Sequence, residues 1–237
     1  MRVLITGGAS GLGAAVAEAV AKDGGRPLVI DRSPVGQVAD QMAGQVVGQV
    51  MVEQVQADLA DRLAAERAVD DLARAAGGLD AVVTAAGIDA CGRLEDVPAA
   101  EWERVIRVNL FGTASVVRAA LPYLRESRGR VVTVASTLGL RAVSDATAYC
   151  ASKFGVVGFT RALAAETAGS VGVTLVVPGG MDTPFFDNRE ERYKPPPDLR
   201  LNDPREVAEA VMFALSRPAG CELRELVICS DQETSWP

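Results

Sequence analysis

The sequence predicts an α/β protein built on a doubly wound, seven-stranded parallel sheet with helices on both faces. Seven short apolar runs alternate with longer Ala-rich amphipathic stretches along the 237 residues. Most of these runs are continuously apolar, which is typical of strands buried on both faces of a parallel sheet. A (β/α)8 barrel would also alternate strands with helices, but it needs an eighth unit that this chain does not offer. A layered sandwich with right-handed crossovers is therefore the predicted architecture.

The expected strands occupy residues 3–6, 27–31, 50–56, 81–84, 131–135, 173–177 and 225–229. The expected helices lie between them, at about 11–23, 35–47, 61–76, 98–126, 146–169 and 204–216. Four Gln residues at four-residue intervals predict one solvated face on the second helix. No linker divides the chain, so we expect one domain over 1–237, with the irregular stretch 184–203 as a substrate lid.

Composition and charge exclude several classes of function. The chain has no His, which excludes Ser-His-Asp and Cys-His hydrolases and His-ligated metal sites. A formal charge of −7, with dispersed Arg residues, argues against nucleic acid and anionic membrane surfaces as partners. The four Cys lack metal-ligand spacing and are expected to be buried small hydrophobes, so no metal site is predicted. Without a membrane-length apolar run or a leader before the first strand, a cytoplasmic location is expected.

The first predicted strand runs into a glycine-rich turn, TGGASGLG, that opens a helix. In such a turn Gly7 permits the tight bend, Gly11 lets backbone N–H groups approach a pyrophosphate, and Gly13 lets helix and strand pack closely. The second strand closes on Asp31, whose carboxylate suits the ribose hydroxyls of an adenosine and repels a 2′-phosphate. The pattern predicts a dinucleotide site that favours NAD(H). Arg32 keeps NADP(H) as an alternative, because a guanidinium pairs with that phosphate.

Four residues are candidates for a catalytic group. Without His, a proton donor must come from other side chains, and the chain has only three Tyr and three Lys. Tyr149 and Lys153 stand four residues apart in a predicted helix and therefore on one face. Ser136 ends the fifth strand, and Asn109 lies in the long helix before that strand. Because ligands bind at the carboxyl ends of the strands in this architecture, these side chains point to chemistry there.

The sequence resembles the short-chain dehydrogenases/reductases, in their single-domain Rossmann-fold form of about 250 residues. The matching segments follow the family's order and spacing: TGGASGLG (6–13), Asp31, QADL (56–59), AAG (85–87), VNLFG (108–112), VASTLG (134–139), YCASK (149–153) and PGGMDTP (178–184). They extend over about three quarters of the chain. The resemblance implies an oxidoreductase that interconverts a secondary alcohol and a ketone by hydride transfer with NAD(P)(H).

The resemblance also implies a role for each matched residue. Tyr149 would be the general acid/base, its phenolate stabilised by Lys153 and by the oxidised nicotinamide. Ser136 would donate a hydrogen bond to the substrate oxygen, and Asn109 would hold a water in a proton relay that runs past Lys153. The implied cofactor contacts are Gly7, Ser10, Gly11, Leu12, Gly13, Asp31, Arg32, Asp58, Leu59, Ala86, Gly87, Tyr149, Lys153, Pro178, Gly179, Met181 and Thr183.

Two segments depart from the family pattern. Thr84-Ala85-Ala86-Gly87 replaces the usual Asn-Asn-Ala-Gly, which removes side-chain amides but keeps the small residues beside the cofactor. The chain ends in SDQETSWP in place of the more common Asp-Gly-Gly, so the subunit contacts and the substrate pocket are less predictable there. Trp236 is equally suited to pack at an interface or to cap the core.

The expected pocket walls, at 88–94, 137–140, 180–181 and 185–186, suggest a small-molecule alcohol or ketone of moderate hydrophobicity. The charged lid residues 189–192 are expected to be solvated. Ala-rich helix faces predict a homodimer or homotetramer, as in the family, or only packing on the chain's own sheet. Two other functions stay open: a non-catalytic dinucleotide-binding regulator on the same fold, and a lyase or epimerase that works through transient hydride transfer.

Overall fold

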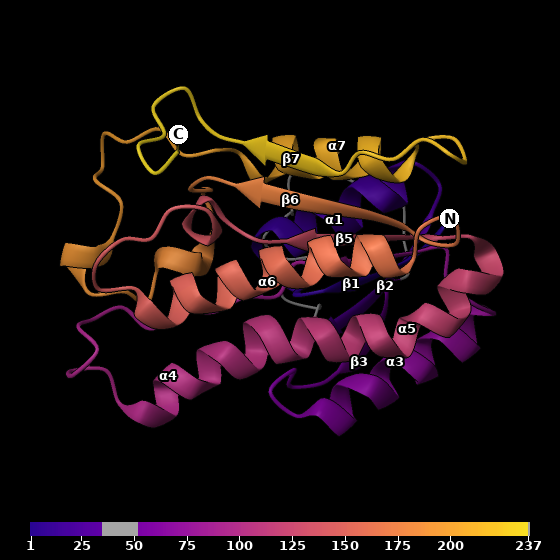
Figure 1. Ribbon diagram of the computed structural model, residues 1–237, viewed down its shortest axis with the longest axis horizontal. Helices are drawn as coiled ribbons and strands as arrows, with labels where there is room; N and C mark the ends of the chain where they lie inside the picture. Colours follow the sequence, from indigo (N-terminus) through magenta and orange to yellow (C-terminus); the bar gives the residue numbers. More distant parts are fainter. Residues whose placement is uncertain (35–51, 237) are drawn as a thin grey trace.

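The computed structural model describes residues 1–34 and 52–236 as a three-layer α/β sandwich (Figure 1). The strands are β1 (Arg2–Thr6), β2 (Arg26–Asp31), β3 (Glu53–Gln56), β4 (Ala81–Thr84), β5 (Arg130–Val134), β6 (Gly172–Pro178) and β7 (Glu225–Ile228). The helices are α1 (Gly11–Lys22), α3 (Arg62–Ala76), α4 (Ala99–Ile106), α5 (Thr113–Ser127), α6 (Thr147–Glu166) and α7 (Pro204–Leu215). Shorter helical segments are η1 (Arg107–Gly112), η2 (Thr137–Gly139), η3 (Pro184–Phe186) and η4 (Glu191–Tyr193).

The seven strands form one parallel sheet in the order β3-β2-β1-β4-β5-β6-β7. The chain winds outward from β1 in one direction and from β4 in the other. In such a sheet a crevice opens at the carboxyl ends of the strands where the winding reverses, and ligands bind there. Thr6 of β1 pairs with Thr84 of β4 at this point, and both are buried. The fold class predicted from the sequence is confirmed.

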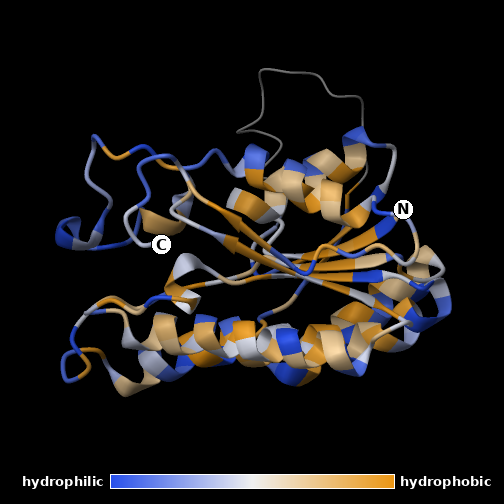
Figure 2. Cartoon of the chain, turned by 45° about the horizontal axis from the view of Figure 1, so that its top comes forward, coloured by the Kyte–Doolittle hydropathy of each residue, from blue (hydrophilic) through white to orange (hydrophobic). Residues whose placement is uncertain are grey.

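Helices cover both faces of the sheet. On one face α3, α5 and α6 pack around strand residues that include Leu4 and Leu28, and on the other α1 and α7 pack around Ile5 and Val29. All four of these side chains are fully buried. Figure 2 shows the result as apolar strands between helices whose outer surfaces carry polar residues. Each such burial stabilises the fold by about 1.5–3 kcal/mol, so the two apolar layers hold the crevice in place.

The two edge strands are more exposed than the apolar pattern predicted. No residue of β3 is fully buried, and in β7 the first and third residues are exposed. The physical reason is that an edge strand has a neighbouring strand on one side only. The helix expected at 35–47 and the first residues of the strand expected at 50–56 lie outside the described residues.

The helix expected at 98–126 is divided into α4, η1 and α5. The middle segment, η1, is a π-helical turn, a feature that is rare in proteins and frequent at functional sites. It contains Asn109, whose side chain is buried. The remaining helices begin and end within three residues of their predicted bounds. Among the described residues, no helix is both long enough and apolar enough to cross a membrane.

Candidate active site

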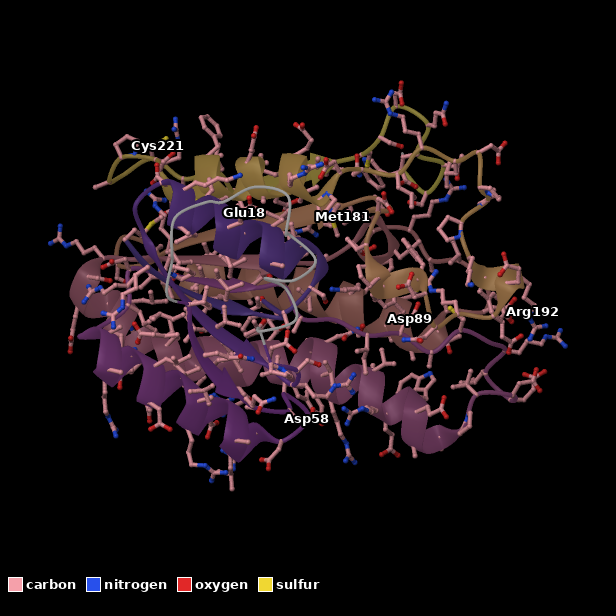
Figure 3. All side chains as sticks on the ribbon, turned by 180° about the vertical axis from the view of Figure 1, so that it is seen from behind. Glu18, Asp58, Asp89, Met181, Arg192 and Cys221 are labelled. Carbon is pink, nitrogen blue, oxygen red and sulfur yellow. The ribbon has the colours of Figure 1, made fainter. Side chains whose placement is uncertain are left out.

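A cavity of about 710 Å³ lies at the carboxyl ends of the central strands. All of the predicted cofactor contacts line it, together with the catalytic candidates Ser136, Tyr149 and Lys153. The fourth candidate, Asn109, is buried behind the cavity wall. Figure 3 shows Asp89 on the side of the molecule where Arg192 of the predicted lid lies. One cavity therefore collects segments that are far apart in the sequence.

The glycine-rich turn has the backbone that close approach to a pyrophosphate requires. Gly7 and Gly11 adopt positive φ angles of 73° and 51°, which other residues rarely adopt. A β-carbon at Gly13 would lie 2.1 Å from the carbonyl oxygen of Gly7, so only glycine lets α1 pack on the turn. The Ser10 side chain makes no capping bond to α1 among the described residues. The N–H groups at this helix end thus remain suited to an anion.

Two acids line the end of the cavity near the glycine-rich turn. The Asp31 carboxylate accepts hydrogen bonds from the backbone N–H groups of Ala9 (2.9 Å) and Ser33 (2.8 Å), which fixes it beside the turn. Asp58 pairs with Arg104 of α4 at 2.8 Å. Burial raises the pKa of Asp58, but a backbone hydrogen bond and Arg104 outweigh burial and hold it below its usual value. Both carboxylates can accept hydrogen bonds from a ligand, and one of them carries a partner that the sequence analysis did not identify.

Tyr149 and Lys153 lie in the first two turns of α6, and both line the cavity. The Lys153 Nζ atom lies 5.6 Å from the centre of the Tyr149 ring and donates a hydrogen bond to the carbonyl oxygen of Val134 (2.9 Å). Ser136 follows β5, and its hydroxyl accepts a hydrogen bond from the Leu138 N–H (3.1 Å). Because β5 packs against α6, Ser136 after the strand lines the same cavity as Tyr149 and Lys153 of the helix.

Burial sets the proton affinities of the two α6 side chains. It raises the pKa of Tyr149 to about 12, against a hydrogen bond with Ser136 that lowers it. It lowers the pKa of Lys153 to about 8. The sequence analysis expected Lys153 to favour the phenolate of Tyr149. In the structure the desolvation of Tyr149 prevails, so the phenol keeps its proton at neutral pH.

Asn109 connects the π-helical turn to the loop after β4. Its side chain accepts a hydrogen bond from the Ile88 N–H (2.9 Å) and donates to the Ile88 carbonyl (2.8 Å) and the Ser152 hydroxyl (3.0 Å). A β-carbon at Gly87 would lie 3.6 Å from Lys153 Nζ and 3.7 Å from Asn109 Oδ1, so glycine keeps space between these two polar groups. The segment that departs from the family pattern is also braced here, because the Thr6 hydroxyl accepts a hydrogen bond from the Ala86 N–H (3.2 Å).

The predicted lid contacts the catalytic candidate Tyr149 directly. Phe185 packs against Tyr149 with ring centres 5.6 Å apart, and Arg189 lies over the Phe185 ring at 5.0 Å. Arg189 also forms an ion pair with Asp89 from the loop after β4, and only 16% and 11% of the two side chains are exposed. The expectation that the charged lid residues are solvated is therefore wrong for Arg189, because a buried acid neutralises it. It holds for Arg192, which lies at the tip of the lid in Figure 3.

The pocket walls expected from the sequence are only partly correct. Ile88 and Asp89 line the cavity, but Leu94 does not, and it is 61% exposed. The sequence analysis also missed Arg104 and two residues near the C-terminus, Glu233 and Ser235, all of which line the cavity. No local signal identifies them, because their partners lie tens of residues away in the sequence.

Comparison with known proteins agrees with this arrangement. Residues 1–194 match the family model described as short chain dehydrogenase. The L-fucose dehydrogenase of Mus musculus is 30% identical, over 99% of this chain and 89% of its own length. Two solved structures are similar, each with a TM-score of 0.85. They are levodione reductase (32% identity, 99% of this chain and 97% of that chain) and the alcohol dehydrogenase of Thermococcus sibiricus complexed with 5-hydroxy-NADP (27% identity, 96% and 95%).

The chain belongs to the short-chain dehydrogenase family. It is an oxidoreductase with a Rossmann-type fold that acts on CH–OH groups. Each of the proteins compared is similar in fold and sequence. The residues that line the cavity determine the reaction and the substrate of this chain.

Proposed function

We propose that the protein interconverts a secondary alcohol and a ketone with NAD(P)(H), with Tyr149 as the general acid/base. The observation that supports this most is that Tyr149, Ser136 and Lys153 share one cavity with the glycine-rich turn. That arrangement supplies a proton donor, a hydrogen-bond donor and a dinucleotide cradle within one space. The substrate is proposed to be a small molecule that enters beneath the lid, 184–203.

Specific residues would hold the dinucleotide. The turn at Gly7, Gly11 and Gly13 would bind the pyrophosphate, and Asp31 the adenosine ribose. The other proposed contacts are Asp58 and Leu59 at the adenine, Ala86, Gly87 and Lys153 at the nicotinamide ribose, and Pro178, Gly179, Met181 and Thr183 at the nicotinamide and its carboxamide. When bound, the nicotinamide accepts or supplies the hydride.

The proton chemistry belongs to the chain's own residues. In reduction, the phenol of Tyr149 would protonate the oxygen of the substrate, because burial keeps that phenol protonated at neutral pH. The Ser136 hydroxyl would donate a hydrogen bond to the same oxygen as negative charge develops on it. The Lys153 ammonium, 5.6 Å from the ring centre, would stabilise the phenolate that remains. Asn109, held by Ile88, is proposed to anchor the water that returns the proton.

We propose NAD(H) as the preferred cofactor. Asp31 carries a negative charge that two backbone N–H groups fix beside the glycine-rich turn, and that charge would repel a 2′-phosphate. Arg32 also lines the cavity and is the group that would accept NADP(H). Fluorescence titration with NADH and NADPH decides between them: NADH is expected to bind at least about tenfold more tightly, and Asp31→Asn to reduce that ratio. Tighter binding of NADPH to the wild-type protein would overturn the preference.

The assignment of Tyr149 is tested with Tyr149→Phe, measured as oxidation of NADH in the presence of a panel of ketones. We expect kcat to fall by about 10²–10⁴-fold, because the proton donor is removed, while NADH still binds. Tyr123→Phe is the matched control. Its hydroxyl contacts Asp70 on the outer helix layer (3.1 Å), so activity is expected to persist. Activity of Tyr149→Phe comparable to that of the control would contradict the proposed mechanism.

We also propose that the protein forms a homodimer or homotetramer. The expected helix faces are partly used within the chain, since Val117, Ala120 and Val157 are buried. Phe111 and Phe154, in η1 and α6, remain 57% and 44% exposed. Light scattering of the purified protein measures the assembly, and a monomer at micromolar concentration would refute it.

A further inference from the structure

The C-terminal tail, 229–236, returns to the active site. Figure 1 shows the end of the chain beside the carboxyl ends of β6 and β7, on the same side of the molecule as the lid. Glu233 and Ser235 of this tail line the same cavity as Ser136 and Tyr149. The family resemblance gives no role to these two residues, because the tail departs from the family's usual ending.

Hydrogen bonds fix the tail against two active-site loops. The Glu233 carboxylate accepts hydrogen bonds from the Gly180 N–H after β6 (2.8 Å) and from the Ser235 N–H (3.0 Å). The Ser235 hydroxyl lies 2.6 Å from the hydroxyl of Thr137, the residue that follows Ser136. A β-carbon at Gly179 would lie 2.1 Å from Glu233 Oε2, so the carboxylate occupies a space that only glycine leaves open. The tail therefore forms part of the cavity wall and is fixed there by hydrogen bonds and close packing.

The direction of these hydrogen bonds determines what the wall offers to a ligand. The Ser235 oxygen lies 2.7 Å from Glu233 Oε1 and 2.6 Å from the Thr137 hydroxyl. A carboxylate can only accept, so Ser235 donates its single proton to Glu233, and Thr137 then donates to Ser235. In this row of hydrogen bonds the protons of Thr137 and Ser235 both point toward the Glu233 carboxylate. The hydroxyl oxygens of Ser235 and Thr137 keep lone pairs, which a ligand satisfies with O–H or N–H donors.

The charge of this wall favours hydroxyl groups. Burial raises the pKa of Glu233, but hydrogen bonds from Ser235 and Gly180 outweigh it and hold the pKa below the usual value. Within the described residues no ion pair neutralises this carboxylate. A negative wall disfavours anionic substrates, while the Lys153 cation that lines the same cavity disfavours an ammonium group. An uncharged hydroxyl is the donor that both charges tolerate.

We propose that Glu233 and Ser235, positioned by Thr137 and Gly180, form a hydroxyl-binding subsite beside Ser136, and that the substrate is a polyhydroxylated alcohol or its ketone. This inference rests on the proposed function and deepens it. The reacting carbon would face Tyr149 and Ser136, and a further hydroxyl group of the substrate would donate a hydrogen bond to the tail. Glu233 is thus a specificity-determining residue.

The test compares substrates that differ only in their further hydroxyl groups. Cyclohexanol, cyclohexane-1,2-diol and myo-inositol are assayed with NAD, and the ratio of kcat/KM for each polyol to that for cyclohexanol is measured. We expect the wild-type protein to prefer a polyol, and Glu233→Gln to reduce the ratio by about 10- to 100-fold, as for loss of a hydrogen bond to a charged group. Ser235→Ala is expected to reduce the ratio by about tenfold or less, as for a neutral hydrogen bond.

Asp231→Asn is the matched control. It makes the same change of charge in the same tail, but the Asp231 side chain is 72% exposed and lies 3.8 Å from Arg200. The ratio is expected to stay within twofold of the wild-type value. A wild-type preference for cyclohexanol, or a ratio that Glu233→Gln leaves unchanged, would overturn the subsite.

Calorimetry separates failure of the subsite from failure of the proposed function. Binding of myo-inositol to the protein saturated with NADH is measured for the wild type and for Glu233→Gln. Weaker binding by the variant supports the subsite even where no alcohol on the panel is oxidised, a result that would count against the proposed function instead. Equal binding by the two proteins, or none by either, refutes the subsite.

Discussion

Burial of the Lys153 ammonium costs the folded state stability, and Lys153→Met measures that cost. Burial lowers the pKa of Lys153 from its ordinary 10.5 to about 8. A depression of that size costs the folded state about 3 kcal/mol at pH 7, where the group is charged. Methionine fills a similar space without a charge, but it loses the hydrogen bond that the charged Lys153 donates to Val134, which is worth about 1.5–3 kcal/mol. We therefore expect Lys153→Met to be as stable as the wild type or more stable, by up to about 1.5 kcal/mol, while losing activity.

The pH dependence of the difference in stability between Lys153→Met and the wild type shows whether the charge of Lys153 causes it. Between pH 8 and 10.5 the unfolded chain binds a proton at Lys153 that the folded protein does not, so the free energy of unfolding of the wild type rises with pH. The advantage of Lys153→Met is full below pH 8 and disappears as the pH approaches 10.5. Urea unfolding of both proteins at several pH values between 7 and 10.5 measures this difference, in which contributions from other groups cancel.

Lys22→Met is the control for the chemical change itself. Lys22 ends α1 with 50% of its side chain exposed and pairs with Glu18, so its loss is expected to change stability by no more than about 0.5 kcal/mol, with little dependence on pH. A Lys153→Met protein that is less stable than the wild type at pH 7, or a difference that does not change with pH, would refute the reasoning.

Two further predictions concern the cavity walls. Gly13→Ala places a β-carbon 2.1 Å from backbone atoms of Gly7, so we expect a loss of about 1–3 kcal/mol of stability together with at least about tenfold weaker NADH binding. Gly158→Ala in α6 meets nothing within 4 Å and is the control; it is expected to be neutral or stabilising when thermal melts of both variants are compared with the wild type. Asn109→Ala removes both hydrogen bonds to the half-buried backbone N–H and C=O groups of Ile88 and should cost about 1–3 kcal/mol in urea unfolding. A melting temperature of Asn109→Ala equal to that of the wild type would contradict the role given to its amide.

Much of the architecture follows from local sequence patterns. Strands such as β1 and β4 are short and continuously apolar, so both of their faces must be buried. Helix layers on the two sides of the sheet provide this burial. The glycine-rich turn and the i, i+4 pair of Tyr149 and Lys153 are likewise fixed within a few residues. The parallel order of the sheet then brings their ends together at the reversal of winding, which explains why the catalytic candidates could be placed from the sequence.

The sequence alone determined less about the environment of those groups. The patterns that locate Asn109 in a helix do not contain the π-helical turn, which brings its amide to Ile88 across 21 residues. The raised pKa of Tyr149 is also a tertiary effect, because it depends on the desolvation that the lid and its neighbours impose. Local spacing identifies a titratable residue, and packing decides its proton affinity.

The sequence by itself thus determined the fold class, the family and the set of residues that line the cavity around the glycine-rich turn. Only the tertiary structure decided the end of the cavity at the predicted lid and the C-terminal tail, where Arg189 meets Asp89 across 100 residues and Glu233 meets Gly180 across 53. The physical reason is that strands, turns and helix faces have fixed local periodicities, whereas an ion pair or a carboxylate on a distant N–H has none. Such contacts form only when folding brings the two distant residues together.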